Sequence, residues 1–248
     1  VRPFDFSIRK GEVNGFTGLL GSGRSESVRA IFGADHVCGG TVKMDGKQVK
    51  ITSPLRAMKH GISYLPEDRK RDGIIGDLSV RDNIILARQV LDGFFHPISK
   101  AKAEKYAEEY IKLLSIKTAS TDTPIKALSG GNQQKAIVAR EIDKNPELLV
   151  AVQPTRGLDV GAIEYIHKQL VAQRDAGKAV LLVSLELDEV MDVPDRILVM
   201  YEGEIVGELD PKQTTVQELG LYMSGAKRSG KAVSYTHLRA HETVLDLV

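Results

Sequence analysis

The chain has 248 residues, of which 42% are hydrophobic and 27% are charged, and its formal net charge is +1. Such a composition is typical of a globular protein with a sizeable core, and it indicates neither a nucleic-acid nor a membrane-surface partner. The longest apolar run, Ala179–Leu185, is too short to span a membrane, and the single cysteine, Cys38, excludes an internal disulfide.

The first part of the chain predicts strands around one glycine-rich loop. Residues 1–18 form two strands with a turn at Lys10-Gly11, and they lead into GLLGSGRS, Gly18–Ser25, and a helix-like stretch at Glu26–Phe32. The next predicted elements are a strand at Thr41–Met44 with a turn at Asp45-Gly46, a helix at Pro54–His60 capped by Ser53, a strand at Ile62–Leu65 and a charged surface loop at Pro66–Gly73.

Helical patterning replaces strands from Val80 to Asn145, as the apolar face of Lys102–Leu114 illustrates. Beyond it, strands are predicted at Leu148–Val152, Ala179–Ser184, Ile197–Met200 and Ile205–Leu209, with helices at Ala162–Ala176 and Leu187–Asp192. Alternation of strands and helices indicates a mostly parallel sheet. The predicted fold is therefore α/β, divided by an all-helical insertion.

The glycine loop fits the phosphate-loop spacing G-x-x-x-x-G-K-[ST], except that Arg24 stands where lysine is expected. Gly18, Gly21 and Gly23 allow successive backbone N–H groups to turn inward, and the helix that follows points its positive end at the same place. Ser25 offers a hydroxyl suited to a phosphate-bound Mg²⁺. The alternative is a glycine turn with no ligand, which the strand–loop–helix context disfavours.

A second motif, LSGGNQQK at Leu128–Lys135, opens the last helix of the insertion. Ser129 is placed to cap this helix, while Gly130 and Gly131 expose N–H groups at its positive end, which favours an anion. By itself the motif is equally compatible with a capped helix start that binds nothing.

The order of these motifs resembles the nucleotide-binding domain of ABC ATPases. The phosphate loop is followed more than a hundred residues later by LSGG, and then by PTRGLD at Pro154–Asp159. Residues 1 to about 140, with GLLGSGRSE, SYLPEDRKRDGII and DTPIKALSGGNQQK, resemble the second, C-terminal half of the tandem ATPase of monosaccharide importers. The later run AVQPTRGLDVGAIEYIH is more similar to the nucleoside-importer branch.

The resemblance implies a P-loop NTPase core of mostly parallel sheet with an antiparallel β portion and an inserted helical subdomain. We expect one nucleotide-binding domain over residues 1–226, with its α/β core at 1–75 and 146–226 and its helical subdomain at 76–145. The residues expected to bind ATP are Gly18, Leu19, Leu20, Gly21, Ser22, Gly23, Arg24, Ser25 and Glu26. Those expected to contact the nucleotide of a partner domain are Leu128, Ser129, Gly130, Gly131, Asn132 and Gln133.

The same resemblance implies ATP hydrolysis coupled to transport, with Mg²⁺ as cofactor. The implied partners are a second nucleotide-binding domain, membrane permease subunits and, indirectly, a solute-binding protein, at the cytoplasmic face of the cell membrane. Asp159 is expected at the interface between the paired domains, and the alternative for Asp159 is a helix N-cap.

Four residues depart from the hydrolytic pattern of the family, and none of them lies in LSGG. Arg24 replaces the lysine, Val152 and Gln153 replace an Asp-Glu pair, and Leu185 replaces a histidine. Val152 cannot hold a metal's water shell, and Gln153 can orient water without accepting its proton. We therefore expect this half to lend its LSGG loop to a partner while its own site is weak or inactive.

Glu67 stands where the family has glutamine after the fourth strand. With Ser25 it is the candidate Mg²⁺ ligand, and with Gln153 it is a candidate catalytic position, whereas the alternative is a solvated loop charge. Three other functions stay open: an ATPase for nucleoside import, an ATPase of translation or DNA repair, and a regulatory nucleotide-binding module. Neither a long coiled coil nor a basic arm supports the second of these.

Residues 227–248 end in SYTHLRAHETVLDLV, which breaks the preceding pattern and resembles translated vector sequence. We expect this tail to be disordered or non-native and exclude it from the fold. Its His237 and His241 are spaced i and i+4, but with no further ligand nearby they do not predict a metal site. The missing initiating methionine predicts a fragment, and the mixture of two family branches together with this tail predicts a chimera.

Overall fold

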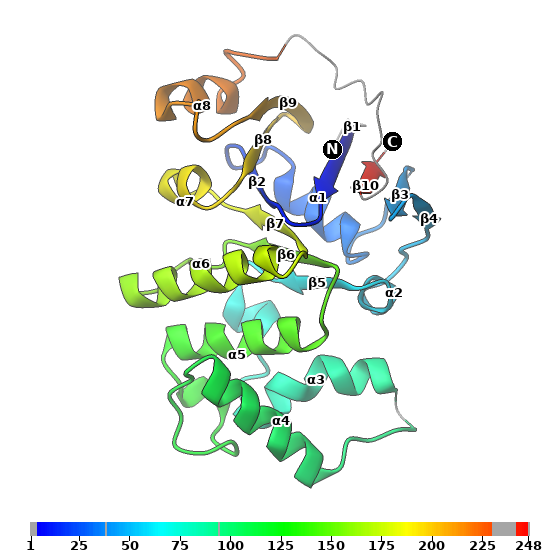
Figure 1. Cartoon of the computed structure of the whole chain (residues 1–248), viewed down its shortest axis with the longest axis vertical. Coiled ribbons are helices and arrows are strands. Elements are labelled where there is room, and N and C mark those ends of the chain that lie inside the picture. The colour runs from blue at the N-terminus through cyan, green and yellow to red at the C-terminus, as the bar shows by residue number, and fades with distance from the viewer. Residues whose placement is uncertain (1–3, 38, 94, 230–241, 248) are drawn as a thin grey trace.

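The computed structural model describes residues 4–37, 39–93, 95–229 and 242–247, arranged around two sheets (Figure 1). The larger sheet has the strand order β5-β6-β7-β2-β8-β9, in which only β9 runs antiparallel to its neighbour. Its strands are β2 (Val13–Thr17), β5 (Ile62–Leu65), β6 (Leu148–Val152), β7 (Ala179–Val183), β8 (Arg196–Tyr201) and β9 (Glu204–Leu209). The predicted α/β fold with a mostly parallel sheet is confirmed.

Each face of this sheet is covered, which explains why its central strands are continuous apolar runs. On one face α1 (Arg24–Ile31) and α2 (Pro54–Lys59) pack over Phe16 and Val150. On the other face, the apolar core joins Leu149 to α5 (Gly130–Asp143) and α6 (Val160–Asp175). A smaller core beneath α8 (Val216–Met223) covers β8 and β9, and α7 (Leu187–Asp192) contributes Val190 to it.

The helical insertion lies at one end of the molecule, in the lower half of Figure 1. It consists of α3 (Val80–Asp92), α4 (Lys100–Leu113), the short 3₁₀ turn η2 (Ile125–Ala127) and α5. Serine side chains cap α3 and α4, because Ser79 accepts from the Asp82 N–H and Ser99 accepts from the Lys102 N–H. Within the described residues, no helix combines the length and the apolarity needed to cross a membrane.

The smaller sheet is antiparallel and has the order β1-β10-β3-β4, with β1 (Phe4–Arg9), β3 (Thr41–Met44) and β4 (Lys47–Val49). The predicted hairpin turn is present, since Asp45 and Gly46 both have positive φ, at 50° and 74°. In this sheet β10 (Glu242–Leu247) lies between β1 and β3. It pairs with β1 from Phe4↔Leu247 to Arg9↔Glu242, and it also pairs with β3.

This placement of β10 differs from the expectation that residues 227–248 stand outside the fold. The physical reason is that a sheet edge offers unpaired backbone N–H and C=O groups, which a strand can satisfy without any match in side-chain pattern. The beginning of the same segment also bonds to the domain, because the Ser229 N–H donates to the Val206 oxygen at 2.8 Å. His237 and His241 lie outside the described residues.

The charged stretch Pro66–Gly73 is more ordered than a plain loop, since Arg69–Gly73 forms one π-helical turn, η1. The Asp68 carboxylate accepts from the Lys70 and Arg71 N–H groups, and the Ile74 N–H closes the turn on the Arg69 oxygen. The turn follows β5, so it lies at the carboxyl end of the parallel strands, where ligand sites of such sheets are found.

Candidate functional site

The glycine loop joins β2 to α1 in a conformation that only glycine adopts readily. Gly21 and Gly23 have φ of 80° and 96°. Gly18 is needed for close approach, because a Cβ there would stand 2.2 Å from the Met200 oxygen. The loop therefore lies tightly against β8, and Gly23 forms the start of α1. Backbone N–H groups at this positive helix end suit a phosphate.

Arg24 is buried at the first position of α1 and is held by two hydrogen bonds. Its Nε donates to the Ser22 hydroxyl at 3.1 Å, and its Nη1 donates to the Ser184 backbone oxygen at 3.3 Å. Desolvation lowers the pKa of Arg24, while the charges of Glu67 and Glu26 oppose this shift. The guanidinium stays cationic, because the ordinary pKa of an arginine side chain lies far above neutrality.

A cavity opens beside this arginine at the carboxyl ends of the parallel strands. It brings together residues 20–26 of the predicted nucleotide-binding run, without Gly18 and Leu19, and all four predicted departures from the hydrolytic pattern. Its lining residues are Leu20, Gly21, Ser22, Gly23, Arg24, Ser25, Glu26, Glu67, Val152, Gln153, Val183 and Leu185. Phosphate, with its need for N–H donors and positive charge, is the ligand that this lining favours.

Gln153 follows β6 with a φ of 47°, which is unusual for a residue other than glycine. Its N–H donates to the Val183 oxygen at 2.8 Å, and its side-chain Oε1 accepts from the Leu185 N–H at 3.5 Å. The amide is thereby docked against the end of β7. It lines the cavity but, being neutral, offers no base for water.

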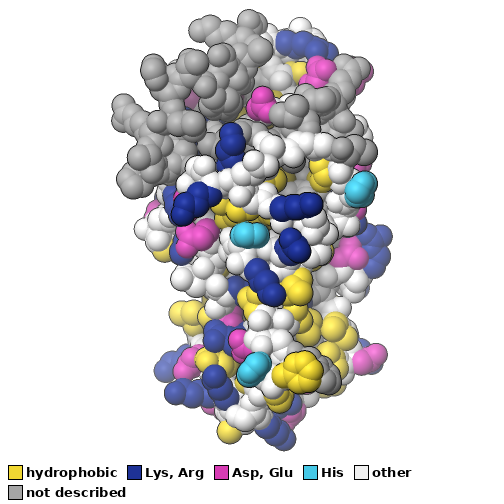
Figure 2. Space-filling model, turned by 90° about the vertical axis from the view of Figure 1, so that its right-hand side faces the viewer, with side chains coloured by type: hydrophobic (Ala, Val, Ile, Leu, Met, Phe, Trp, Pro, Cys, Tyr) yellow, Lys and Arg dark blue, Asp and Glu magenta, His cyan; other side chains and the backbone are white. Residues whose placement is uncertain are grey.

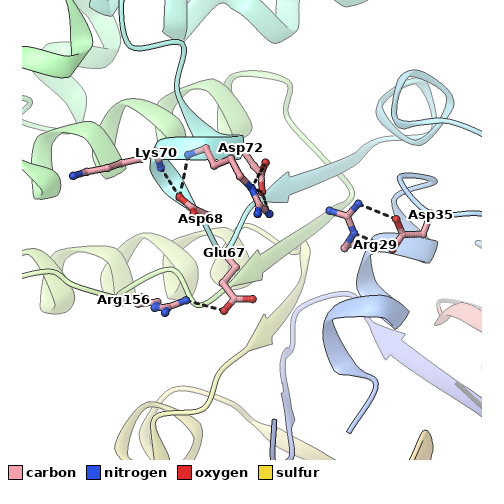
Figure 3. A network of polar contacts seen from close by, with 8 residues as sticks. Arg29, Asp35, Glu67, Asp68, Lys70, Asp72 and Arg156 are labelled. Atoms are coloured by element: carbon pink, nitrogen blue, oxygen red, sulfur yellow. Dashed lines mark hydrogen bonds and ion pairs between the residues drawn. The ribbon is translucent and has the colours of Figure 1, made fainter. Parts of the chain in front are cut away.

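Glu67 also lines the cavity, and its carboxylate forms an ion pair with Arg156, with Oε1 and Nη1 2.9 Å apart. Figure 3 shows the two side chains pointing toward one another from the ends of different strands. The sequence analysis did not single out Arg156. Its only signal was its place in PTRGLD, directly after the turn that ends β6.

The residues predicted for Mg²⁺ fit a metal ion poorly. Ser25 offers a hydroxyl and Glu67 a carboxylate that is already paired, whereas the end of β6 offers Val152, with 1% exposure and no oxygen donor in its side chain. Mg²⁺ in phosphate-loop ATPases is held by the loop hydroxyl and an aspartate at that strand end. The cavity therefore lacks, at the end of β6, the carboxylate on which the usual metal site depends.

The LSGG motif begins α5, but the predicted cap by the Ser129 side chain is wrong. No side-chain hydrogen bond caps this helix start, because the Ser129 hydroxyl accepts instead from the Asn132 side chain, with Oγ and Nδ2 2.9 Å apart. Asn132 also accepts from the Lys117 N–H, and the Gln133 side chain donates to the Leu128 oxygen at 3.0 Å. The side-chain amides of Asn132 and Gln133 therefore hold the motif in place through hydrogen bonds within this chain.

None of the described residues of the LSGG motif lines the cavity, so the predicted nucleotide loop and the motif are not brought together within this chain. Asp159 lies beside the motif instead, with its Oδ2 3.7 Å from the position of a Cβ on Gly131. Its Oδ1 accepts from the Ala162 N–H at 2.9 Å and caps α6. Asp159 is thus an N-cap, and its place at the interface between paired domains stays a prediction.

A profile of the ABC transporter family matches residues 1–156. The chain belongs to this family. It is 45% identical to the guanosine import ATP-binding protein NupO of Bacillus subtilis, over 94% of the chain and 46% of the relative. It is 43% identical to the ribose import ATP-binding protein RbsA of Clostridium tetani, over 90% of the chain and 44% of the relative. The chain therefore spans about half the length of these curated relatives.

Solved structures agree with the fold. The chain superimposes with a TM-score of 0.72 on the ATP-binding cassette MJ0796, solved as a dimer with ADP and Pi, at 24% identity over 85% of this ABC chain and 90% of the other. At that identity the likeness carries the fold alone. The relatives named above show that this ABC chain is homologous to the ATP-binding proteins of sugar and nucleoside importers.

Proposed function

We propose that this ABC chain is the nucleotide-binding part of an ATPase that energises the import of a monosaccharide or a nucleoside. The observation that carries the proposal is the cavity in which the glycine loop, buried Arg24 and the carboxyl end of β6 meet. Backbone N–H groups, a helix end and a guanidinium offer the triphosphate its donors. ATP is the proposed ligand.

In this proposal the domain works with a second nucleotide-binding domain and supplies the LSGG loop to the partner's nucleotide. Val152, Gln153 and Leu185 leave its own site with no carboxylate at the β6 end and no imidazole after β7. Gly130 and Gly131, by contrast, stand at the start of a helix whose first N–H groups have no side-chain cap. Those N–H groups are available to an anion from outside the chain.

The proposed membrane partner is a permease, reached from the cytoplasmic face, with a solute-binding protein acting through it. Apolar side chains gather over the helical part of the face shown in Figure 2. The helical subdomain exposes Leu78, Val90, Phe95 and Leu113, with Phe95 at 88%. Several exposed large apolar residues on one subdomain support a protein partner there.

The two substrate classes rest on different observations. Residues 1–140 resemble the monosaccharide branch, which is our first choice, and the fructose and ribose relatives reach 43% identity. The nucleoside class is the second candidate, because the guanosine and nucleoside relatives reach 45% and 44%. Substrate choice belongs to the permease and the solute-binding protein, so this chain does not decide it.

Calorimetry with ATP tests the proposal directly. We expect the intact chain to bind ATP and to hydrolyse it only slowly when alone. An absence of ATP binding would contradict the assignment of the cavity, and substantial turnover by the isolated chain would contradict the donor role.

A further inference from the structure

We propose that this site binds its nucleotide without a metal ion, with arginine charge in the place of Mg²⁺. The inference deepens the proposed function and rests on it, because it presumes ATP at Gly18–Ser25. Its basis is that the side chains lining the cavity do not fit the Mg²⁺ ion that the family implies.

The carboxylates of the site are the first argument. A metal ion bound between loop and strand end usually takes a carboxylate at the end of β6, and the side chain of Val152 offers none. The neighbouring Gln153 side chain is neutral, and its oxygen accepts from the Leu185 N–H. Glu67 is the one lining carboxylate that comes from a strand end, and it is engaged by Arg156 at 2.9 Å. A divalent ion would have to displace this arginine to reach Glu67.

The cations of the site are the second argument. Arg24 lines the cavity, and its hydrogen bonds to described residues use Nε and Nη1, which leaves Nη2 for a phosphate oxygen. Glu67 lies close enough that its charge acts on Arg24. A triphosphate would replace Glu67 as the anion that faces this guanidinium, with a charge-assisted hydrogen bond from Nη2.

Arg156 affects the site differently from Arg24, because it offsets the negative charge of Glu67. A free carboxylate beside a triphosphate would repel it, and a metal ion usually relieves such repulsion. Here Arg156 neutralises Glu67, so no ion is needed between that carboxylate and the phosphates. The cavity and its rim thus carry Arg24, Glu67 and Arg156, in which Arg156 offsets the charge of Glu67 and Arg24 is left to face the phosphates.

Titration of the complete chain with ATP, once with excess magnesium chloride and once with EDTA, tests this inference by calorimetry. We expect the two dissociation constants to agree within about threefold, and a loss of more than about tenfold in EDTA would overturn the inference. Binding that requires Mg²⁺ leaves the proposed function intact. An absence of binding under both conditions would overturn the proposed function and this inference with it.

Two substitutions at exposed positions sharpen the test. If Glu67 held a metal, Glu67→Gln would weaken binding with Mg²⁺ and leave binding in EDTA unchanged; we expect it to leave both unchanged or tighten both. Arg156→Gln should weaken binding in EDTA more than with Mg²⁺, because Glu67 is then left uncompensated. Lys70→Gln is the matched control, since Lys70 lies on the same loop and points away from Glu67 in Figure 3.

Discussion

The Arg24 guanidinium and the Ser184 backbone oxygen are joined by a hydrogen bond of 3.3 Å that links the start of α1 to the end of β7. Through this contact the glycine loop is anchored to the strand that precedes Leu185. Arg24 makes this contact and the bond to Ser22 from two different nitrogens of its planar guanidinium, whereas a lysine has a single nitrogen. Arg24 therefore carries a positive charge at the glycine loop and also links α1 to the end of β7.

Arg24→Ala should weaken ATP binding by about tenfold, because a charge-assisted contact to phosphate is lost while the backbone N–H groups remain. Isothermal titration of the variant and the unaltered chain measures the change. Arg29→Ala is the control, since Arg29 lies on the same helix and pairs at 2.8 Å with Asp35 outside the cavity. Equal losses in both variants would mean that the cation at position 24 has no special role.

The hydrogen bond between Thr155 and Glu189 is expected to stabilise the folded state. The Thr155 hydroxyl donates to Glu189 Oε1 at 3.0 Å, and His167 Nε2 lies 2.7 Å from the same oxygen. Glu189 is buried, and its Oε2 has no hydrogen-bond partner among the described residues. Thr155→Val should therefore lower the free energy of unfolding by about 1–2 kcal/mol, because it removes one of few donors to a buried carboxylate.

Urea unfolding monitored by circular dichroism measures this loss. Thr214→Val is the control, because the Thr214 hydroxyl donates to the Asp210 oxygen at an exposed position. An unchanged urea midpoint for the Thr155 variant would show that the contact contributes nothing.

The lowered pKa of Glu141 predicts that the free energy of unfolding depends on pH. Desolvation by burial raises the pKa of Glu141, but the charges and hydrogen bonds of Lys144 and Arg140 together outweigh it and hold the pKa below its ordinary value of 4.5. A carboxyl with a depressed pKa in the folded state stabilises the fold above the unfolded value, and that stability is lost as the pH falls through the folded value. The loss should begin below about pH 4.5.

Glu141→Gln should cost about 3 kcal/mol near neutral pH, since one partner of a buried charged cluster is removed. The difference from the unaltered chain should begin to shrink below about pH 4.5 and vanish as the pH falls through the lower folded-state pKa, where Glu141 becomes neutral in the folded chain too. Chemical unfolding at a series of pH values measures both. Glu164→Gln, at an exposed ion pair with Lys168, is expected to show little change at any pH. A difference that stays constant with pH would mean that the charge of Glu141 is not what stabilises the fold.

Two neighbouring strands of the larger sheet, β5 and β6, could be predicted to the residue because each is a short apolar run bounded by turn-forming or polar residues. Ile62–Leu65 and Leu148–Val152 have the predicted bounds. Helix α8 was not predicted, since Gly220 interrupts its pattern and its stability comes from packing of Leu219 and Met223 on β8 and β9. The π-helical turn after β5 depends on bonds to one side chain, Asp68, which periodicity does not reveal.

The candidate site, like the fold, could be predicted only in part from the sequence. The glycine loop follows from its spacing, and Gln153 and Leu185 follow from their places after predicted strands. The Glu67–Arg156 ion pair could not be predicted, because it joins the ends of β5 and β6, which become neighbours only when the sheet forms. Likewise the Ser129 cap failed because Asn132 competes for the hydroxyl.

The LSGG loop gives the last prediction, for the assembled transporter. Ser129→Arg should lower ATPase activity roughly a hundredfold, because donors aimed at phosphoryl charge contribute on that scale and the arginine adds bulk beside Gly130. The restoration Val152→Asp with Gln153→Glu should change activity far less, since Leu185 and Arg24 still alter the same cavity. The measurement is phosphate release at saturating ATP by the complete ATPase with its permease. Should the Ser129 variant keep normal turnover, or the restored double variant gain many-fold, then the donor and acceptor roles of the two domains are reversed.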